Sequence, residues 1–241
     1  MDYLIIIPAR YQSSRFPGKP LADICGKSMI QRVWEKCVEA TSTDRVLVAT
    51  DDQQIKEHCK DHDIHVMFTR ENCLTGTDRL YEVAKKRKSD IYINVQGDEP
   101  LISPIDIKTI LKAAQQEPGI TFNAMCPIKN EDDFRNPNIP KVVTQTDGRL
   151  LYISRAPIPS NKQLGVEKGA MKQVCIYAYP RDVLLTFGSL KEKTPLESKE
   201  DIEILRLLEL GYEVKMIEVS DSSISVDTPQ DLEKVRSMIH D

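Results

Sequence analysis

Short apolar runs alternate with amphipathic segments along most of the chain, which predicts strands and helices in turn. Runs rich in apolar residues, as expected of strands in a sheet covered on both faces, lie at 4–7, 45–50, 64–68, 91–96, 120–128, 173–179 and 213–219. Segments predicted to be helical lie at 28–40, 53–63, 104–116 and 201–211, and from about 78 and 228 onward. This order predicts an α/β fold with a doubly wound, mostly parallel sheet.

Several predicted helices have residues suited to their ends. Ser28 and Thr228 can accept a hydrogen bond from the first turn of the helix that follows each of them, and Pro229 suits the first position of the last helix. Gly211 is expected to close the helical segment at 201–211, because a left-handed backbone directly after the last helical residue favours glycine.

Residues 131–172 differ in character from the rest of the chain. They are rich in proline and contain two alternating segments, KVVTQT and RLLYISRAPIP, separated by Asp147-Gly148. An Asp-Gly pair between alternating segments is a strong signal for a β-hairpin. We therefore predict a small inserted antiparallel lobe at 131–172, suited to a dimer contact, within a single domain that spans 1–241.

Composition excludes several classes of protein. Lysine and arginine number 33 against 37 aspartates and glutamates, and this net charge of −4 argues against binding to nucleic acid along an extended basic face. No apolar run is long enough for a membrane span, and the N-terminus lacks a signal-peptide pattern, so we expect a soluble, cytoplasmic protein without membrane partners. The six cysteines form no CxxC pair, which argues against a zinc site.

Three cations follow the first predicted strand. Arg10, Arg15 and Lys19 lie in a loop punctuated by prolines and a glycine, at the strand end where open α/β sheets bind ligands. Such a loop favours a polyanion, for example a nucleoside triphosphate, although a solvated loop with the same cations remains an alternative. The motif GxxxxGK[ST] is absent, which disfavours P-loop chemistry.

Two aspartates also fall at the ends of predicted elements. Asp98 directly follows the strand at 91–96, and Asp227 directly precedes the last helix. Two carboxylates facing one pocket would suit Mg²⁺, which combines a few carboxylates with phosphate oxygens and water. Each could instead be a turn former or a helix cap. Together with the basic loop they favour phosphoryl-type transfer, but composition does not separate a kinase from a pyrophosphorylase or a nucleotidyltransferase.

Five motifs together closely resemble those of one enzyme family. IIPARYQSSRFPGKPL, LTGTDRL, INVQGDEPLI, YISRAPIP and VDTPQDLEKV resemble the CMP-Kdo synthetases, or 3-deoxy-manno-octulosonate cytidylyltransferases, over nearly the whole chain. The resemblance implies a fold like that of the nucleotide-diphospho-sugar transferases, with a small lobe that forms a homodimer. It also implies that CTP and a 3-deoxy-2-ulosonic acid (Kdo or a relative) react with Mg²⁺ to give a CMP-sugar and pyrophosphate for lipopolysaccharide or capsule.

The resemblance also assigns roles to individual residues. For the nucleotide it implies Arg10, Arg15, Lys19, Thr77, Arg79 and Gln96. For catalysis it implies Lys19, Asp98 and Asp227, of which the two aspartates would hold Mg²⁺. For the sugar acid it implies Arg155, Gln173, Tyr177, Glu203 and Ile204.

Two of these positions depart from the family pattern. Gln173 stands where the family's HLGIYGY motif has histidine, and Ile204 stands where its ESLEQLR motif has glutamine. Because a site built to hydrogen-bond a hydroxyl discriminates strongly, these changes suggest that CTP is retained while the ulosonic acid differs from Kdo. The alternative is that both changes are neutral and the sugar is the same.

Three other functions compete with this one. A CMP-sialic-acid-type synthetase for a nine-carbon acid is the runner-up, although QGDEP and VDTPQDL favour an octulosonate enzyme. A sugar-1-phosphate nucleotidyltransferase would be expected to open with GxGxR, which is absent. An inactive nucleotide-binding or scaffold module would have no need of Lys19, Asp98 and Asp227 together.

Overall fold

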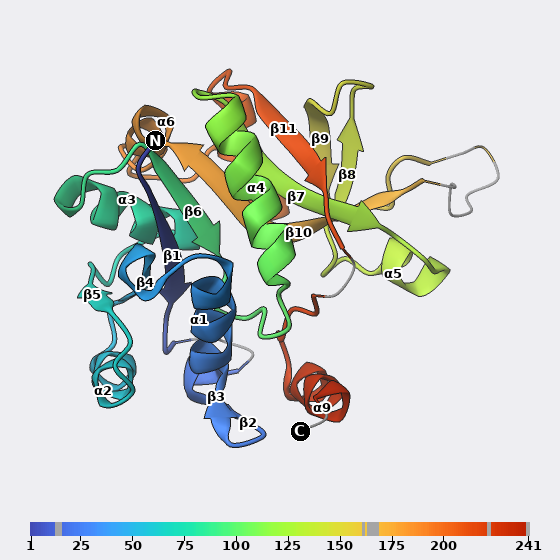
Figure 1. Ribbon diagram of the computed structural model, residues 1–241. Helices are drawn as coiled ribbons and strands as arrows, with labels where there is room; N and C mark the ends of the chain where they lie inside the picture. The colour runs from blue at the N-terminus through green and yellow to red at the C-terminus, as the bar shows by residue number, and fades with distance from the viewer. Residues whose placement is uncertain (13–15, 161, 163–168, 221–222, 240–241) are drawn as a thin grey trace.

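The structure is a computed structural model that describes residues 1–12, 16–160, 162, 169–220 and 223–239. Its centre is a nine-stranded sheet with helices on both faces (Figure 1). The strands of that sheet are β1 (Tyr3–Ala9), β4 (Val46–Thr50), β5 (Val66–Phe68), β6 (Ile91–Val95), β7 (Thr121–Pro127), β8 (Lys141–Thr144), β9 (Leu150–Ser154), β10 (Met171–Pro180) and β11 (Val214–Glu218). The helices are α1 (Met29–Ala40), α2 (Gln53–Asp61), α3 (Gly76–Lys86), α4 (Pro104–Gln116), α5 (Glu131–Arg135), α6 (Arg181–Phe187), α7 (Pro195–Glu200), α8 (Leu205–Glu209) and α9 (Pro229–Met238).

The main path of the sheet runs β11-β7-β10-β6-β1-β4-β5. Strand β1 pairs in parallel with β4 and β6, β4 with β5, and β11 with β7, whereas β10 is antiparallel to both of its neighbours. The predicted doubly wound, mostly parallel sheet is thus confirmed. The direction of β10 is the feature that the pattern of apolar residues did not reveal.

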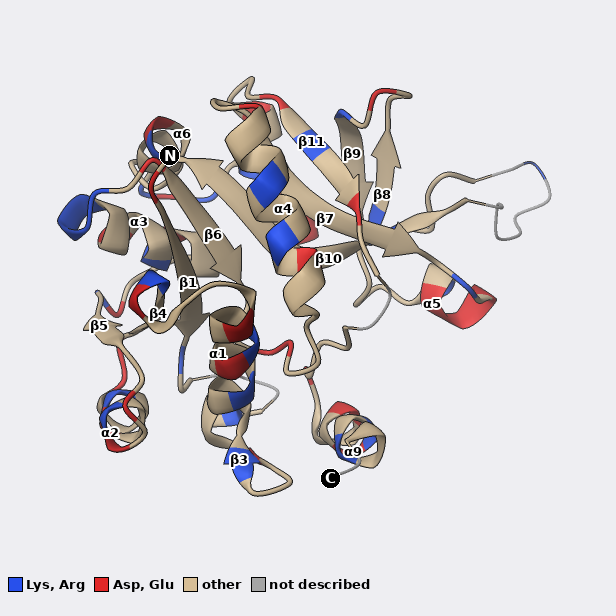
Figure 2. Cartoon of the chain, viewed as in Figure 1, with Lys and Arg blue, Asp and Glu red and all other residues tan. Residues whose placement is uncertain are grey.

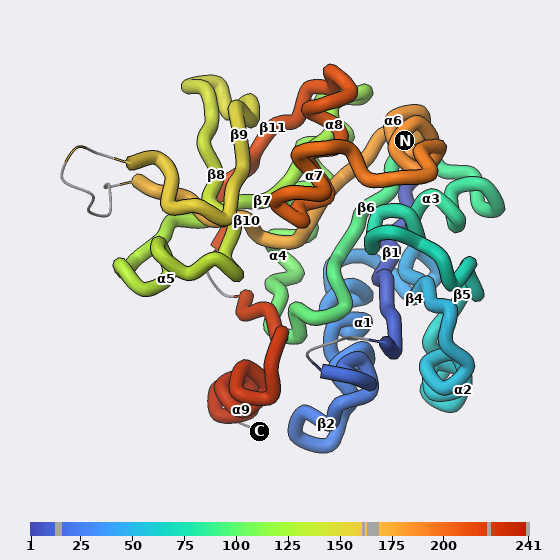
Figure 3. Tube along the Cα trace, turned by 180° about the vertical axis from the view of Figure 1, so that it is seen from behind, coloured from blue at the N-terminus to red at the C-terminus, as the bar shows by residue number. Residues whose placement is uncertain are grey.

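Side chains of β1 show why the sheet needs cover on both faces. Ile5 and Ile7 pack in one core with α1 and α4, while Leu4 and Ile6 pack in the other core with α3 and α6. Successive strand residues point to opposite faces, so a continuous apolar run supplies both cores. Helices α3, α6, α7 and α8 are seen from the second face in Figure 3.

The predicted hairpin around Asp147-Gly148 is confirmed. Strands β8 and β9 pair antiparallel, and the Gly148 N–H donates to the Gln145 carbonyl at 3.1 Å with a positive φ of 88° at the glycine. Strand β8 pairs with the start of β10 through Met171 and Lys172, so the hairpin branches from the central sheet (Figure 1). The boundaries of the lobe at 131–172 stay a prediction.

Most predicted helix ends are also confirmed. The Ser28 hydroxyl accepts from the Gln31 N–H at the start of α1, and Thr228 caps α9 in a reciprocal arrangement with Asp231. Gly211 has a φ of 79° directly after α8 and its cap. Helix α3 begins at Gly76, two residues earlier than expected, because Thr75 caps it.

The helix predicted at 201–211 is wrong at its N-terminal end. Asp201 adopts a left-handed backbone with a φ of 53° and ends α7, and α8 begins only at Leu205. Glu203 lies in the turn between the two helices, where its carboxylate accepts hydrogen bonds from the start of α3. Tertiary hydrogen bonds therefore override the helical spacing of this segment.

Helix α9 lies away from the central sheet, beside the small sheet of β2 (Asp23–Ile24) and β3 (Lys27–Ser28) (Figure 1). Arg236 of α9 donates two hydrogen bonds to the Asp23 carbonyl, and Leu232 and Val235 pack with Ile24 and Met29. Lysines and arginines are scattered over many elements (Figure 2). None of the described helices is long and apolar enough to cross a membrane.

Candidate active site

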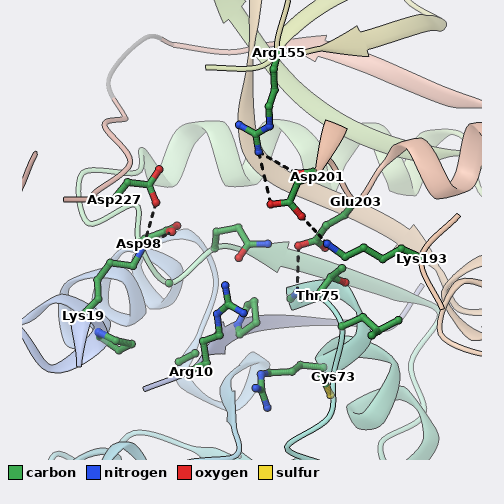
Figure 4. A pocket seen from close by; sticks show the side chains of 18 residues that line it. Arg10, Lys19, Cys73, Thr75, Asp98, Arg155, Lys193, Asp201, Glu203 and Asp227 are labelled. Carbon is green, nitrogen blue, oxygen red and sulfur yellow. Dashed lines mark hydrogen bonds and ion pairs between the residues drawn. The ribbon is translucent and has the colours of Figure 1, made fainter. Parts of the chain in front are cut away.

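A cavity of about 480 Å³ lies at the carboxyl ends of β1 and β6, where the sequence placed the ligand. Its walls include Ala9 and Arg10 from the end of β1 and Gln96 and Asp98 after β6 (Figure 4). Gly97 allows these two strand ends to approach, because a Cβ at this position would lie 2.9 Å from the Pro8 carbonyl oxygen. The close approach brings the basic loop and the first acidic residue to one edge of the cavity.

The structure brings Lys19, Asp98 and Asp227 together. The Lys19 ammonium lies 2.8 Å from Asp98 Oδ2 and 3.5 Å from Asp227 Oδ1, and all three side chains line the cavity (Figure 4). Lys19 begins a short 3₁₀ turn after Gly18, whose positive φ of 72° favours glycine. Three segments far apart in the sequence thus supply one cluster of charges.

Asp227 is held in place by the residues beside it. The Val226 N–H donates to the Asp98 carbonyl at 2.9 Å, which fixes the two acidic residues relative to each other.

Glu99, the residue after Asp98, is buried and accepts from the Ser223 hydroxyl and, at 3.2 Å, from the Cys175 N–H. Burial raises the pKa of Glu99, and the hydrogen bond from Ser223 opposes that rise.

The pair Asp98 and Asp227 suits Mg²⁺ in its chemistry. Both carboxylates already face one cation, the Lys19 ammonium, and both are partly open to the cavity. The described residues contain no cluster of three or more His, Cys, Asp or Glu side chains arranged to hold a metal ion. A site with two carboxylates matches an ion that takes its remaining ligands from phosphates and water.

The residues predicted to bind the nucleotide are brought together only in part. Arg10 and Gln96 line the cavity, and Arg79 reaches its wall from α3. The Arg79 guanidinium is already engaged, because it forms an ion pair with Asp51 and donates to Thr69 Oγ1 at 2.8 Å. Arg79 therefore also fixes the start of α3 against the ends of β4 and β5.

The prediction that the Thr77 side chain contacts the nucleotide is not supported. The side chain is fully buried and lines neither cavity formed by the described residues. Its hydroxyl lies 3.2 Å from both Tyr179 Oη and Asn94 Nδ2 in the core. Arg15 lies outside the described residues, so its role stays a prediction.

The N-terminus of α3 faces a partly buried carboxylate. Glu203 accepts from the Gly76 N–H at 3.1 Å and from the Thr77 N–H at 2.9 Å. Burial raises the pKa of Glu203, and these hydrogen bonds oppose the rise. A Cβ on Gly76 would lie 2.9 Å from Gln96 Nε2, so a side chain there would press on a residue of the cavity wall.

A second cavity of about 740 Å³ adjoins the first and contains most of the residues predicted for the sugar acid. Arg155, Gln173, Tyr177 and Glu203 line it, and Arg155 and Glu203 also line the first cavity. Gln173 Nε2 donates to Asn123 Oδ1 at 2.8 Å, which fixes the amide toward β7. Burial raises the pKa of the Tyr177 hydroxyl, so this group stays a neutral donor.

Arg155 is held by main-chain groups from two segments. Its guanidinium donates to the carbonyls of Pro137, Glu200 and Asp201, at 2.9 Å, 2.5 Å and 3.0 Å. These bonds connect residues of the predicted lobe to the turn between α7 and α8. Arg155 therefore positions the wall shared by the two cavities.

The structure places Ile204, which the resemblance assigns to the sugar acid, in the core and away from both cavities. Ile204 is fully buried in the core that contains Leu4 and Ile6, and it lines neither cavity formed by the described residues. An isoleucine here is an ordinary core residue. The argument for an altered sugar specificity therefore rests on Gln173.

Two residues that no sequence pattern marked, Lys193 and Asp201, line the first cavity opposite Lys19 (Figure 4). They form an ion pair with 2.5 Å between Lys193 Nζ and Asp201 Oδ1. Lys193 lies in an irregular segment, and Asp201 was assigned to a helix. Neither position carried a pattern that marks a binding residue.

The fold and the cavity define a class of enzyme. Cations and a pair of carboxylates suited to Mg²⁺ face one cavity at the carboxyl edge of a mostly parallel α/β sheet, an arrangement that suits phosphoryl-type transfer. A family model described as "Cytidylyltransferase" matches residues 4–217. The chain belongs to the cytidylyltransferase family.

Relatives of known name extend this result over the whole chain. The chain is 44% identical to a 3-deoxy-manno-octulosonate cytidylyltransferase of Syntrophotalea carbinolica, with 98% of both chains covered. It is 43% identical to the enzyme of that name from Escherichia coli, with 98% of this chain and 95% of the relative covered. A solved structure of CMP:2-keto-3-deoxy-manno-octonic acid synthetase complexed with CTP has a TM-score of 0.91 and 41% identity, with 99% of this chain and 98% of that chain covered.

A more distant structure shows the breadth of the fold. A putative glucose-1-phosphate thymidylyltransferase from Bacillus anthracis has a TM-score of 0.71 at 14% identity, with 98% of this chain and 94% of that chain covered. At this identity the likeness concerns the fold alone.

Proposed function

We propose that this enzyme transfers the cytidylyl group of CTP to the C2 hydroxyl of 3-deoxy-manno-octulosonate (Kdo), with release of pyrophosphate. The observation that carries the proposal is the convergence of Lys19, Asp98 and Asp227 at the edge of a cavity large enough for a nucleotide. The full-length similarity to enzymes named for this reaction supports the choice of CTP and Kdo.

Lys19, Arg10 and Gln96 have separate tasks in this reaction. The C2 hydroxyl loses its proton to water and attacks the α-phosphorus, a new P–O bond forms, and the bond to pyrophosphate breaks, so that pyrophosphate leaves with the bonding electron pair. Negative charge grows on the phosphate oxygens, and the Lys19 ammonium stabilises it from the edge of the cavity. Arg10 and Gln96 lie along the same wall and orient the nucleotide.

Asp98 and Asp227 would hold Mg²⁺ in this proposal. The ion, when bound, neutralises phosphate charge and lowers the pKa of a hydroxyl that touches it. The hydrogen bond from the Val226 N–H to the Asp98 carbonyl holds the two aspartates next to each other. A separate histidine base is then unnecessary, in agreement with a cavity whose described lining contains no histidine.

Gln173 favours a second candidate substrate. Its amide binds Asn123 and lines the second cavity, where the family resemblance places a histidine. A ulosonic acid related to Kdo, with eight or nine carbons, is therefore a test substrate beside Kdo itself.

We further propose a cytoplasmic homodimer that forms through the hairpin of β8 and β9 and feeds the synthesis of lipopolysaccharide or capsule. Strand β9 pairs only with β8 among the described strands, and Leu151 on it is 53% exposed. An uncovered strand edge with an exposed leucine suits a symmetric contact. A molar mass near 27.4 kDa in light scattering would contradict the dimer.

The reaction is tested by measuring pyrophosphate release from the purified chain with CTP, Mg²⁺ and Kdo, and with other nucleotides and ulosonic acids in turn. We expect CTP and Kdo to give the highest kcat/KM and a chelator to abolish turnover. Asp98→Asn and Asp227→Asn should each lower kcat by about 100-fold or more. The exposed Asp132 lines neither cavity, and Asp132→Asn is the control. Full activity of either site variant would overturn the metal assignment.

A further inference from the structure

Lys193 and Asp201 form an ion pair on the wall opposite Lys19. Lys193 lies between α6 and α7, and Asp201 follows α7, so the pair joins the two ends of that short helix (Figure 4). Both residues line the first cavity, and Asp201 also lines the second. The pair therefore lies at the junction of the two cavities.

Asp201 is an exposed anion among cations. Its carboxylate is 71% exposed, yet it lies 2.5 Å from Lys193 Nζ and 4.0 Å from Arg155 Nη2. The hydrogen bond from Lys193 lowers the pKa of Asp201 most, and the charges of Lys193, Arg155 and Arg10 lower it further. Its left-handed backbone ends α7 and is one that aspartate adopts more readily than most residues.

The ion pair is easily exchanged because water reaches it. A pair with so exposed a carboxylate contributes little to stability, since solvent screens the attraction and competes for both partners. An anion of a substrate can therefore replace the Asp201 carboxylate at Lys193 without loss of a strong interaction.

Of the other cations that line the first cavity, the exposed Arg10 is assigned to the nucleotide, and the remaining three have stronger commitments. Lys19 faces Asp98 and Asp227, and Arg79 is buried against Asp51. Arg155 donates to three main-chain carbonyls. The Lys193 ammonium, by contrast, donates to the side chain of Asp201, which is 71% exposed.

We propose that Lys193 binds the carboxylate of the sugar acid and that Asp201 is its counter-ion in the absence of substrate. This inference rests on the proposed function. In a 2-ulosonic acid the carboxylate is attached to C2, the carbon that bears the attacking hydroxyl. That hydroxyl must meet the α-phosphate at the junction of the two cavities, so the carboxylate lies there too. A neutral sugar would not displace Asp201, and the pair thus selects for acids.

Two variants of the same ion pair test this proposal, because they should act in opposite directions. Lys193→Met should raise KM for Kdo by about tenfold or more, as expected for a lost charge-assisted hydrogen bond, with KM for CTP changed less than about twofold. Asp201→Asn removes the competing anion and should lower KM for Kdo by about two- to fivefold. A pair with only a structural role would give a higher KM in both variants, and that result would overturn the proposal.

Lys191→Met is the matched control, because Lys191 is an exposed lysine of the same segment that lines neither cavity. Lys193→Arg should recover most of the affinity for Kdo, since it restores the charge. An effect of Lys193→Met on KM for CTP alone would show a phosphate contact instead and would also overturn the proposal. If the wild type turns over and the variants have the same KM for Kdo, the role of Lys193 is refuted and the proposed function stands. If the wild type releases no pyrophosphate, the proposed function and this inference are refuted together.

Discussion

Arg206 provides the sharpest test of what stabilises the wall behind the active site. Its side chain is fully buried, and Nε and Nη2 each donate to Glu197 at 2.6 Å. Nη1 donates to Asp78 Oδ1 and to the Phe187 carbonyl, both at 3.0 Å. One guanidinium therefore connects α3, α6, α7 and α8, and it fixes the turn that carries Asp201.

Arg206→Met keeps much of the apolar stem and removes the charge. The buried carboxylates of Glu197 and Asp78 then lose their cation, and loss of one partner from a buried ion pair typically lowers the free energy of unfolding by about 3–5 kcal/mol. For a domain of this length, 1 kcal/mol corresponds to about 2–4 °C, so Tm should fall by about 6–20 °C. Urea and thermal unfolding followed by circular dichroism measure both quantities.

Two control variants complete the experiment. Arg135→Met breaks an exposed pair with Glu131 on α5 and should change the free energy of unfolding by less than about 1 kcal/mol. The triple variant Asp78→Asn, Glu197→Gln, Arg206→Met removes every charge of the cluster and should recover much of the stability. The reasoning is refuted if Arg206→Met loses less than about 1 kcal/mol, or if the triple variant is no more stable than the single one.

Three further substitutions test the packing and the caps. Gly188→Ala should lower the free energy of unfolding by about 1–3 kcal/mol or more, because a Cβ there would lie 2.1 Å from Tyr81 Cγ. An unchanged midpoint in urea unfolding would contradict this contact. Lys141→Met removes a buried ammonium that donates to three main-chain carbonyls, and it should lower the free energy of unfolding by about 2–4 kcal/mol. An unchanged free energy of unfolding would mean that water fully replaces the ammonium. Thr228→Ala should cost about 1 kcal/mol and speed amide exchange in α9, and equal exchange rates would argue against the cap.

Several parts of the fold could be predicted because the signals are local. The apolar run at 4–7 marks a strand that supplies both cores, and Asp147-Gly148 marks a turn whose backbone suits those residues. Ser28 and Thr228 mark helix starts because their hydroxyls satisfy nearby N–H groups. Each signal depends on neighbours in the sequence, so none needed knowledge of the tertiary structure.

Other parts depend on contacts between distant segments. The direction of β10 follows from its place between β6 and β7, and Asn123 supports a bulge there by donating to the carbonyls of Val174 and Ile176. Ile204 and Glu203 are neighbours in one motif, yet one side chain enters the core and the other faces the cavity. A sequence pattern does not specify such directions in an irregular turn.

The residues of the candidate site also differ in whether the sequence could predict them. Lys19, Asp98 and Asp227 could be predicted because each lies at the end of an element and the ends of parallel strands meet at one edge. Lys193 and Asp201 meet only through the folding of α7 against its neighbours, and no periodicity marked them. Thr77 belonged to a recognised motif, but the packing of α3 turns its side chain inward.

The last 15 residues supply one half of the acidic pair and none of the central sheet. Every strand of that sheet lies before residue 219, because β11 ends at Glu218. A protein cut short between Glu218 and Val226 would therefore contain every strand of the sheet, together with Lys19 and Asp98. It would lack Asp227, the hydrogen bond from Val226 to Asp98 and the buried side chains of α9 that pack with Ile24 and Met29.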